Sequence, residues 1–405
     1  MDTKESRVRY LHVTSEGEAL EALRGVDADP CTIRESLPKM IHANIILEHI
    51  ESTAANIIRQ EMRHVGGDAA TAPDVAECRT AHGDVIVMGT LAQIRGLAEK
   101  ITLHPLVGLC GISERISQVL NNLSLDSVPL RTSRREMVLG DRTLIMGILN
   151  VTPDSFSDGN RFASPESAVE EGIRMAEEGA DMIDIGGEST RPGSDTVPQE
   201  EELRRVIPVI RGLAARIDIP LSVDTMKAAV AREALAEGAE IVNDVSSLGF
   251  DDRMAEIVAD AGAAVILMHM RGMPKTMQTG DLTYRSLQGE IIGFLQDRID
   301  RARANGIEPV RVMVDPGLGF GKTATDNLRL IRHLGELRIL GRPIVSGASR
   351  KSFIGHVTGG TPRERMEGTA AAVTAAVLNG SRIIRVHDVG AMKKVAAIAD
   401  ALRSA

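Results

Sequence analysis

In the last two-thirds of the chain, short apolar runs repeatedly end in polar or glycine-rich segments. These runs are continuous in Ile, Val, Leu and Met, which is typical of parallel strands buried on both faces. Glycine often stands between a helical pattern and the next run, as in EEGADMIDI and AEGAEIVND. There it supplies the left-handed conformation that ends a helix. The pattern predicts strands over residues 144–150, 182–186, 220–224, 241–245, 264–269, 311–315, 343–347 and 383–387.

Helical patterns separate these strands, and a terminal one covers about residues 390–403. Ser164 before Pro165 predicts a helix start, because serine caps a helix and proline suits its first position. Thr225 is a candidate cap for the helix that ends near Ala236. Strands and helices that alternate in this way predict an α/β fold, a (β/α)8 TIM barrel whose strand ends meet at one rim.

The first 130 residues follow a different pattern and predict a small α/β domain of unknown function. Residues 124–135 contain Pro129 and mixed charge, and we expect them to be a linker. The predicted domains are therefore 1–130 and 131–405. We expect helices over 47–64, 91–101 and 113–123 and a strand over 84–90.

Composition limits the classes of partner. The chain has 405 residues, 43% of them hydrophobic and 25% charged, which is ordinary for a globular protein. A net charge of −9 argues against non-specific binding to nucleic acid or to an anionic membrane. The three cysteines are far apart, and we find no signal peptide and no long apolar run. We therefore expect a cytoplasmic protein without a membrane segment.

Isolated polar residues in both regions allow more than one interpretation. Asn150 ends the first strand, before a loop of hydroxyls and carboxylates. Such oxygens suit Mg²⁺, although an asparagine there could instead satisfy loop amides. His42, His49 and His64 are isolated in the N-terminal region, and we interpret them as surface or packed residues rather than metal ligands.

A series of segments carries a family resemblance. In order along the chain they read NVTPDSFSDG, DIGGESTRPG, SVDT, IVNDVS, LMHMRGMPKTMQ, DPGLGFGK, GASRKSFIG and RVHDV. Together they resemble the dihydropteroate synthase family over roughly residues 140–400, which is all of the predicted barrel. The resemblance implies condensation of 6-hydroxymethyl-7,8-dihydropterin diphosphate with p-aminobenzoate, which gives 7,8-dihydropteroate and diphosphate in folate synthesis. It also implies a homodimer of TIM barrels that uses Mg²⁺.

The resemblance assigns the pterin pocket to residues at the ends of strands, namely Asp224, Asn243, Asp315 and Lys351. The pyrimidinone edge of a pterin presents an amino group, a ring N–H and a carbonyl. An ionised aspartate accepts hydrogen bonds, asparagine does both and lysine donates, so these types fit that edge. Without the resemblance, each residue could equally belong to a ring of balanced charges at the barrel mouth.

The resemblance assigns the leaving diphosphate to Thr190, Arg385 and His387, with Asn150 holding its Mg²⁺. Arg191 follows Thr190 in the glycine-containing loop GGESTRPG. Arg385 and His387 are two residues apart on one strand, so their side chains share a face. A lone histidine there could also be an ordinary core residue.

We expect the reaction to be dissociative, with the diphosphate leaving before the weakly basic aniline nitrogen attacks. The expected p-aminobenzoate site includes Ser349 and Lys351, covered by loops that carry Phe156 and Pro192. The residues expected to be catalytic are Asn150, Asp224, Lys351, Arg385 and His387.

Two other functions remain open at this point. A methyltetrahydrofolate:corrinoid methyltransferase shares a pterin-binding barrel, and a non-catalytic pterin-binding protein would leave the main role to the N-terminal domain. DPGLGFGKT lacks the spacing of a phosphate-binding P-loop, because its glycines alternate. We interpret it as a turn that presents Asp315.

Overall fold

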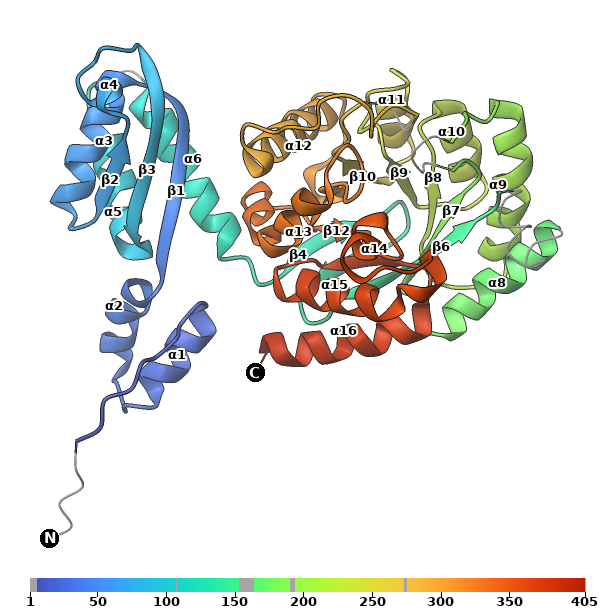
Figure 1. Ribbon diagram of the computed structural model, residues 1–405, viewed down its shortest axis with the longest axis horizontal. Coiled ribbons are helices and arrows are strands. Elements are labelled where there is room, and N and C mark those ends of the chain that lie inside the picture. Colours follow the sequence, from blue (N-terminus) through green and yellow to red (C-terminus); the bar gives the residue numbers. More distant parts are fainter. Residues whose placement is uncertain (1–5, 107, 153–163, 190–193, 273–274, 405) are drawn as a thin grey trace, which may run out of the picture. The chain divides into compact units, whose positions relative to one another are not determined.

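The computed structural model describes residues 6–106, 108–152, 164–189, 194–272 and 275–404 (Figure 1). The chain forms two compact units, Met1–Ser124 and Leu125–Ala405. Their hydrophobic cores share no residue, since that of the first unit ends at Leu120 and those of the second begin at Leu130. The domain boundary expected after residue 130 falls within strand β4 (Val128–Arg131).

The N-terminal unit contains a three-stranded antiparallel sheet in the order β1-β3-β2. The strands are β1 (His42–Glu51), β2 (Asp68–Thr71) and β3 (His82–Thr90). Buried side chains of helices α3, α5 and α6 join those of the sheet in one core. The helices of the unit are α1 (Glu16–Arg24), α2 (Pro30–Met40), α3 (Ser52–His64), α4 (Pro73–Ala76), α5 (Leu91–Thr102) and α6 (Leu109–Leu123).

The helix predicted over residues 47–64 is wrong in its first part, because β1 continues to Glu51. Strand β1 pairs with β3 from His42 opposite Thr90 to Glu51 opposite His82. These backbone hydrogen bonds are made to a distant segment, which a local periodicity cannot reveal. The helix predicted over 91–101 is confirmed as α5, whose capping box joins Thr90 and Gln93.

The second unit is an eight-stranded parallel sheet in the order β11-β10-β9-β8-β7-β6-β13-β12. A parallel bridge between Val314 and Ile344 joins β11 to the segment before β12 and closes the sheet into a barrel. All of the predicted strands are present, and the predicted TIM barrel is confirmed. They are β6 (Leu144–Asn150), β7 (Met182–Gly186), β8 (Leu221–Asp224), β9 (Ile241–Asp244), β10 (Ala264–Met268), β11 (Val312–Asp315), β12 (Val345–Ser346) and β13 (Ile383–Val386).

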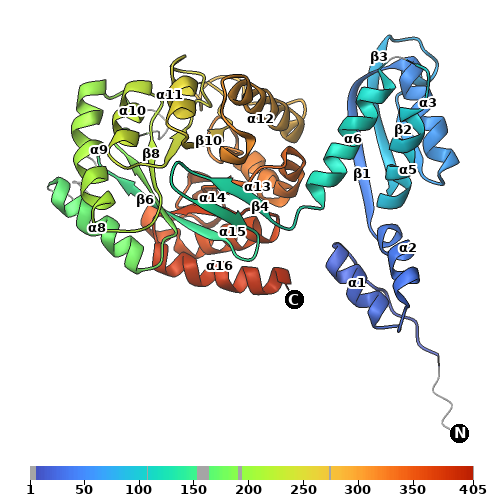
Figure 2. The ribbon, with the colours of Figure 1, turned by 180° about the vertical axis from the view of Figure 1, so that it is seen from behind.

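Helices surround this barrel (Figure 2). Ser164 caps α8 as predicted, and its hydroxyl accepts from Ser167 N. Thr225 does not cap α10, where Asp251 accepts from Ala228 N instead. Among the described residues, no helix is both long and apolar enough to cross a membrane. The helices are α8 (Pro165–Glu177), α9 (Gln199–Ala214), α10 (Ala228–Ala236), α11 (Met254–Asp260), α12 (Leu287–Ala304), α13 (Ala324–Arg332), α14 (Ser352–Thr358), α15 (Met366–Leu378) and α16 (Val389–Ser404), with 3-10 turns η1 (Pro309–Arg311), η2 (Leu334–Leu340) and η3 (Pro362–Glu364).

The strands divide their side chains between two environments. Residues such as Ile183 and Ile185 pack outward against the helices. Alternate residues such as Met146, Met182 and Met313 fill the barrel interior. Because side chains alternate along a strand, the residues two and four positions further on also face inward. The inward positions are therefore apolar near the start of the strands and polar near their ends.

A β-hairpin occupies the segment that the sequence analysis assigned to a linker. Strands β4 and β5 (Glu136–Leu139) pair antiparallel, with Val128 opposite Leu139. Leu130 and Leu139 join the core cluster of inward residues that includes Met146 and Met313. These members belong to the first half of each strand, so the hairpin closes the amino end of the barrel.

We expect Leu139→Ala to lower the free energy of unfolding of the barrel by about 2–5 kcal/mol, because it leaves a cavity in this core. Val138→Ala is the matched control, since Val138 lies in the same strand and is 75% exposed. Urea denaturation of both variants tests the role of the hairpin. Equal losses in the two variants would contradict it.

Candidate active site

The carboxyl ends of the barrel strands bring the described site residues together. Asp224 and Asp315 end β8 and β11, Asn243 lies on β9, and Arg385 lies on β13. Lys351 follows β12, and its charge interacts with Asp315, Arg385 and Asp224. The convergence predicted from the sequence therefore holds for these residues.

Arg385 is the central cation of the site. Its Nη2 donates to Asp224 Oδ2 at 2.8 Å, and its Nε donates to Asp184 Oδ2 at 2.6 Å. Both carboxylates are buried, and Asp184 is fully inaccessible. One guanidinium thus balances two carboxylates inside the barrel, as its fork of donors allows.

Asp184 is a site residue that the sequence analysis missed. It lies in the middle of β7 between Ile183 and Ile185, and besides Arg385 it accepts from Asn243 Nδ2 at 2.9 Å. A charged residue in the middle of a strand buried on both faces was the available signal, because such residues are rarely buried without a partner.

The pKa of Asp224 is raised from its usual 3.8 to about 8. Burial is the main cause, and the neighbouring Asp184 carboxylate adds to it. Arg385 opposes this rise but is shared between the two acids. In the protein without ligand, the Asp224 carboxyl group therefore holds a proton near neutral pH.

Lys351 and Asp315 attract each other by charge. Burial lowers the pKa of Lys351 to about 8, and the attraction of Asp315 limits the fall. Burial also raises the pKa of Asp315, whose Oδ1 accepts from Gly317 N at 2.6 Å. The Lys351 ammonium lies 4.5 Å from the centre of the Phe320 ring and donates to the Leu318 carbonyl.

The turn after β11 depends on its glycines. Gly317, Gly319 and Gly321 have φ angles of 68°, 83° and 64°, which favour glycine. A Cβ on Gly317 would lie 1.9 Å from the His269 carbonyl oxygen. This agrees with the interpretation of DPGLGFGKT as a turn that presents Asp315.

A buried lysine, also missed by the sequence analysis, fastens this turn. Nζ of Lys322 is 2.9 Å from His269 Nδ1 and 2.9 Å from the Gly317 carbonyl oxygen, and it also donates to the carbonyls of His269 and Phe320. Burial lowers the pKa of Lys322, while Asp315 raises it. Burial and Lys322 lower the pKa of His269 to about 2, so its ring stays neutral and can accept.

An apolar wall stands beside these polar groups. Its buried members are Met226, Val245 and Met268, and Met270 and Phe320 pack against them. Met226, Val245 and Phe320 follow the strands that carry Asp224, Asn243 and Asp315, and Met268 ends the apolar strand β10. Flexible thioethers and one ring suit the flat face of a heterocycle.

His387 and Ser349 lie side by side at the ends of neighbouring strands. Ser349 Oγ is 3.0 Å from His387 Nδ1, and His387 N donates to the same oxygen at 3.3 Å. Thr190 and Arg191 lie outside the described residues, as do Phe156 and Pro192.

Asn150 ends β6 opposite Gly186 in the register with β7. Within the described ranges, no group of three or more His, Cys, Asp or Glu side chains could hold a metal ion. A single amide oxygen nevertheless fits Mg²⁺, which keeps several waters and completes its shell with substrate phosphates. The donor at Asn150 therefore suits a metal that arrives with a diphosphate.

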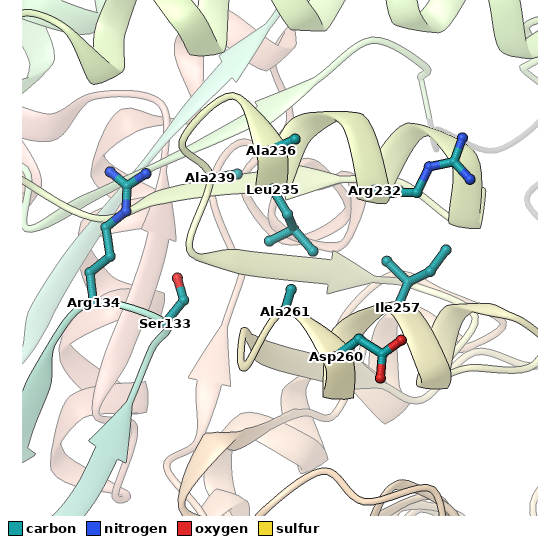
Figure 3. A pocket seen from close by; sticks show the side chains of 9 residues that line it. All are labelled: Ser133, Arg134, Arg232, Leu235, Ala236, Ala239, Ile257, Asp260 and Ala261. Carbon is teal, nitrogen blue, oxygen red and sulfur yellow. The ribbon is translucent and has the colours of Figure 1, made fainter.

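A separate cavity of about 510 Å³ lies away from this chemistry (Figure 3). Ser133 and Arg134 of the β4–β5 loop line one side. The last part of α10 and the end of α11 line the rest, with Arg232, Leu235, Ala236, Ala239, Ile257, Asp260 and Ala261. These segments precede β9 and β10, so the cavity is at the amino side of the barrel.

The chain is similar to known proteins over the barrel. A family model for pterin binding enzymes matches residues 146–387. A dihydropteroate synthase of Synechocystis sp. is 48% identical over 276 residues, which are 68% of this chain and 95% of that protein. The structure of Xanthomonas albilineans dihydropteroate synthase with 4-aminobenzoic acid has a TM-score of 0.64 and 46% identity, and covers 69% of this chain and 99% of that one.

One relative also covers the N-terminal unit. A probable bifunctional folylpolyglutamate synthase/dihydropteroate synthase of Halobacterium salinarum is 36% identical over 406 residues, which are 99% of this chain and 48% of that protein. The chain spans about half the length of this relative.

A parallel barrel with a polar rim, an apolar wall and this family match define the class: the chain belongs to the pterin binding enzymes. Within that class its family is that of the dihydropteroate synthases, which are transferases of folate synthesis.

Asp224 gives this site a pH dependence that can be measured. Its raised folded-state pKa makes a contribution to stability that is complete below about pH 4 and is lost as the pH rises through about 8. The Asp224→Asn variant lacks this titratable carboxyl group. We expect the free energy of unfolding of the wild type, relative to this variant, to fall between those pH values.

Urea denaturation of both proteins from pH 4.5 to 9 measures this difference. Asp252→Asn is the control, because the Asp252 side chain is 97% exposed. A difference between wild type and Asp224→Asn that stays constant with pH would contradict the raised pKa.

Proposed function

We propose that this rim holds 6-hydroxymethyl-7,8-dihydropterin diphosphate and joins it to p-aminobenzoate, giving 7,8-dihydropteroate and diphosphate. One observation supports these roles: five polar side chains lie close together beside the apolar wall. They are Asp224, Asn243, Asp315, Lys351 and Arg385. A flat heterocycle with several donors and acceptors on one edge is the kind of ligand that this combination fits.

The pterin edge would lie against Asp224, Asn243, Asp315 and Lys351. Two acids, an amide and an ammonium offer both acceptors and donors in a buried place. A pyrimidinone that satisfies them would be strongly preferred, because an analogue lacking one group leaves a buried polar atom unpaired. Because the pKa values of Asp224 and Lys351 are both about 8, ligand binding can change the protonation state of either side chain.

The leaving diphosphate would lie on the β6 and β13 side of the rim. Arg385 and His387 would stabilise the negative charge that develops on it, with Thr190 and Arg191 as further donors. Asn150 would hold Mg²⁺, which when bound neutralises part of the diphosphate charge. Arg385 can also place its planar guanidinium over the ring, as lysine cannot.

The p-aminobenzoate would enter at the corner of Ser349 and Lys351. The Ser349 hydroxyl, held beside His387, is a donor for its carboxylate. The aniline nitrogen is a weak base and needs no strong general base, since a dissociative reaction makes a cationic pterin first. Asp224 and Asp315, once ionised, would favour that cation by charge.

We propose further that the protein is a cytoplasmic homodimer. Cys31, Cys78 and Cys110 are exposed and unpaired, which suits a reducing compartment.

The test of the function is diphosphate release that requires both p-aminobenzoate and Mg²⁺. Methyl transfer would need a corrinoid partner and release no diphosphate. We expect Asn150→Ala to lower kcat by about tenfold or more, because it removes a metal ligand, while pterin affinity changes little.

Asn305→Ala is the matched control, since Asn305 lies at the far end of α12. Titration of Mg²⁺ in the Asn150→Ala variant should show a weaker metal dependence. Equal losses in kcat and in pterin affinity would refute the metal role.

We expect deletion of residues 1–124 to leave a folded barrel that retains its activity. The cores of the two units share no residue, and the Synechocystis relative consists almost wholly of the barrel region. Steady-state kinetics and a mass measurement of the truncated protein check this. An inactive but folded barrel would show that the N-terminal unit takes part in the reaction.

A further inference from the structure

Asp184 lies below the rim, and none of the roles proposed above uses it directly. It is a β7 residue with no exposed surface, and its inward direction alternates with the outward Ile183 and Ile185. A carboxylate in that position needs strong partners, because its burial costs hydration. Its partners are Asn243, proposed above to bind the pterin edge, and Arg385, proposed to bind the diphosphate and to cover the ring.

Both contacts fall on one oxygen. Asp184 Oδ2 accepts from Arg385 Nε at 2.6 Å and from Asn243 Nδ2 at 2.9 Å. Its other oxygen, Oδ1, is buried and has no hydrogen-bond partner among the described residues. The residue thus ties β7 to β9 and β13 across the barrel interior.

The first consequence concerns the Asn243 amide. Such an amide can turn either its oxygen or its NH₂ toward a neighbour, but a carboxylate can only accept. Asp184 therefore holds the NH₂ of Asn243, and the amide oxygen is left to meet a donor on the ligand. The hydrogen bond to Asp184 therefore fixes the orientation of the Asn243 amide before any ligand binds.

The second consequence concerns the Arg385 guanidinium. Asp184 takes Nε and Asp224 takes Nη2, so two carboxylates fix its plane at two atoms. Among the described residues, no hydrogen bond uses the third nitrogen, Nη1. This nitrogen can therefore donate to an anionic group of the substrate. A plane held at two atoms is preorganised, which lowers the entropy lost on binding.

We propose that Asp184 is a positioning residue that sets the pterin specificity of this site, by fixing which end of the Asn243 amide and which edge of the Arg385 guanidinium the substrate meets. The inference rests on the proposed function. It assigns no contact with the substrate to Asp184 itself.

The test is Asp184→Asn, which keeps the shape but can both donate and accept. Asn243 is then free to present either end, and Arg385 loses a charged partner. We expect the KM for the pterin diphosphate to rise about tenfold to a hundredfold, with little change in the KM for p-aminobenzoate. A purely structural role would lower the active fraction and hence kcat, without separating the two KM values.

Ligand discrimination gives a readout that does not need turnover. Calorimetry would compare a 2-amino-4-oxopteridine with a 2,4-diaminopteridine, in which an amino donor replaces the carbonyl acceptor and a bare nitrogen acceptor replaces the ring N–H donor. We expect the wild type to bind one of these two pteridines much more tightly than the other, and Asp184→Asn to have a smaller ratio of the two affinities. An unchanged ratio of affinities in a folded variant would overturn the proposal.

Asp244→Asn is the matched control. Asp244 is equally buried on β9. It accepts hydrogen bonds from Ser246 N at 2.8 Å and Leu248 N at 2.7 Å. Among the described residues, it makes no hydrogen bond with Asn243 or Arg385. We expect it to lower the melting temperature and to leave both KM values unchanged. If it raised the pterin KM as Asp184→Asn does, loss of any buried carboxylate would explain the effect and the proposal would fail.

Two further outcomes keep the proposals separate. A wild type without diphosphate release would defeat the proposed function, whereas an active wild type with an unaffected Asp184→Asn defeats only this inference. If Asp184→Asn does not fold, a structure of the wild type with a bound pterin tests whether Asp184 orients the Asn243 amide. Asn243 must then keep Nδ2 on Asp184 and present Oδ1 to a ligand donor, and the reverse orientation would overturn the inference.

Discussion

The sharing of one guanidinium by two buried carboxylates is the interaction on which the candidate site depends. Asp184 and Asp224 both lie inside the barrel, where an unpaired carboxylate is costly, and Arg385 reaches both through different nitrogen atoms. Burial and the neighbouring Asp184 carboxylate raise the pKa of Asp224, and the shared Arg385 offsets this rise only in part. The site is therefore held in place by charge, yet it retains a proton that a ligand can displace. Asp315 and Lys351 also interact by charge at the rim, and burial moves their pKa values toward each other.

Such a cluster needs a rigid scaffold, and the barrel supplies it. Inward side chains near the start of the strands are methionine, isoleucine, valine and alanine, and the β4–β5 hairpin closes that end with Leu130 and Leu139. The apolar layer excludes water from beneath the charges, which strengthens their interactions. At the other end, the glycines after β11 let the chain pass close to the His269 carbonyl, and Lys322 fastens the turn from inside. The polar rim is thus supported by a turn that is held by close packing and by hydrogen bonds.

The N-terminal unit is built on separate principles. Its sheet is antiparallel, its core is its own, and its histidines His42 and His49 are exposed, with His49 stacked on His82 at 4.3 Å between ring centres. The match to the Halobacterium relative extends across this unit, whereas the Synechocystis relative aligns with about two-thirds of the chain. The unit is therefore an addition to a barrel that is complete without it in other proteins.

The sequence by itself determined the strands of the barrel and most of the rim, because apolar runs buried on both faces and polar residues at their ends are local signals. Asp224, Asn243, Asp315, Lys351 and Arg385 could be identified in this way, with the family resemblance supplying their roles. Only the tertiary structure decided what depends on partners distant in the chain. Strand β1 was mistaken for helix because its hydrogen bonds go to β3, and the hairpin was mistaken for a linker because its two leucines are buried only against the barrel. Asp184 and Lys322 went unnoticed for the same reason: a buried charge shows its function only when the groups that compensate it are known.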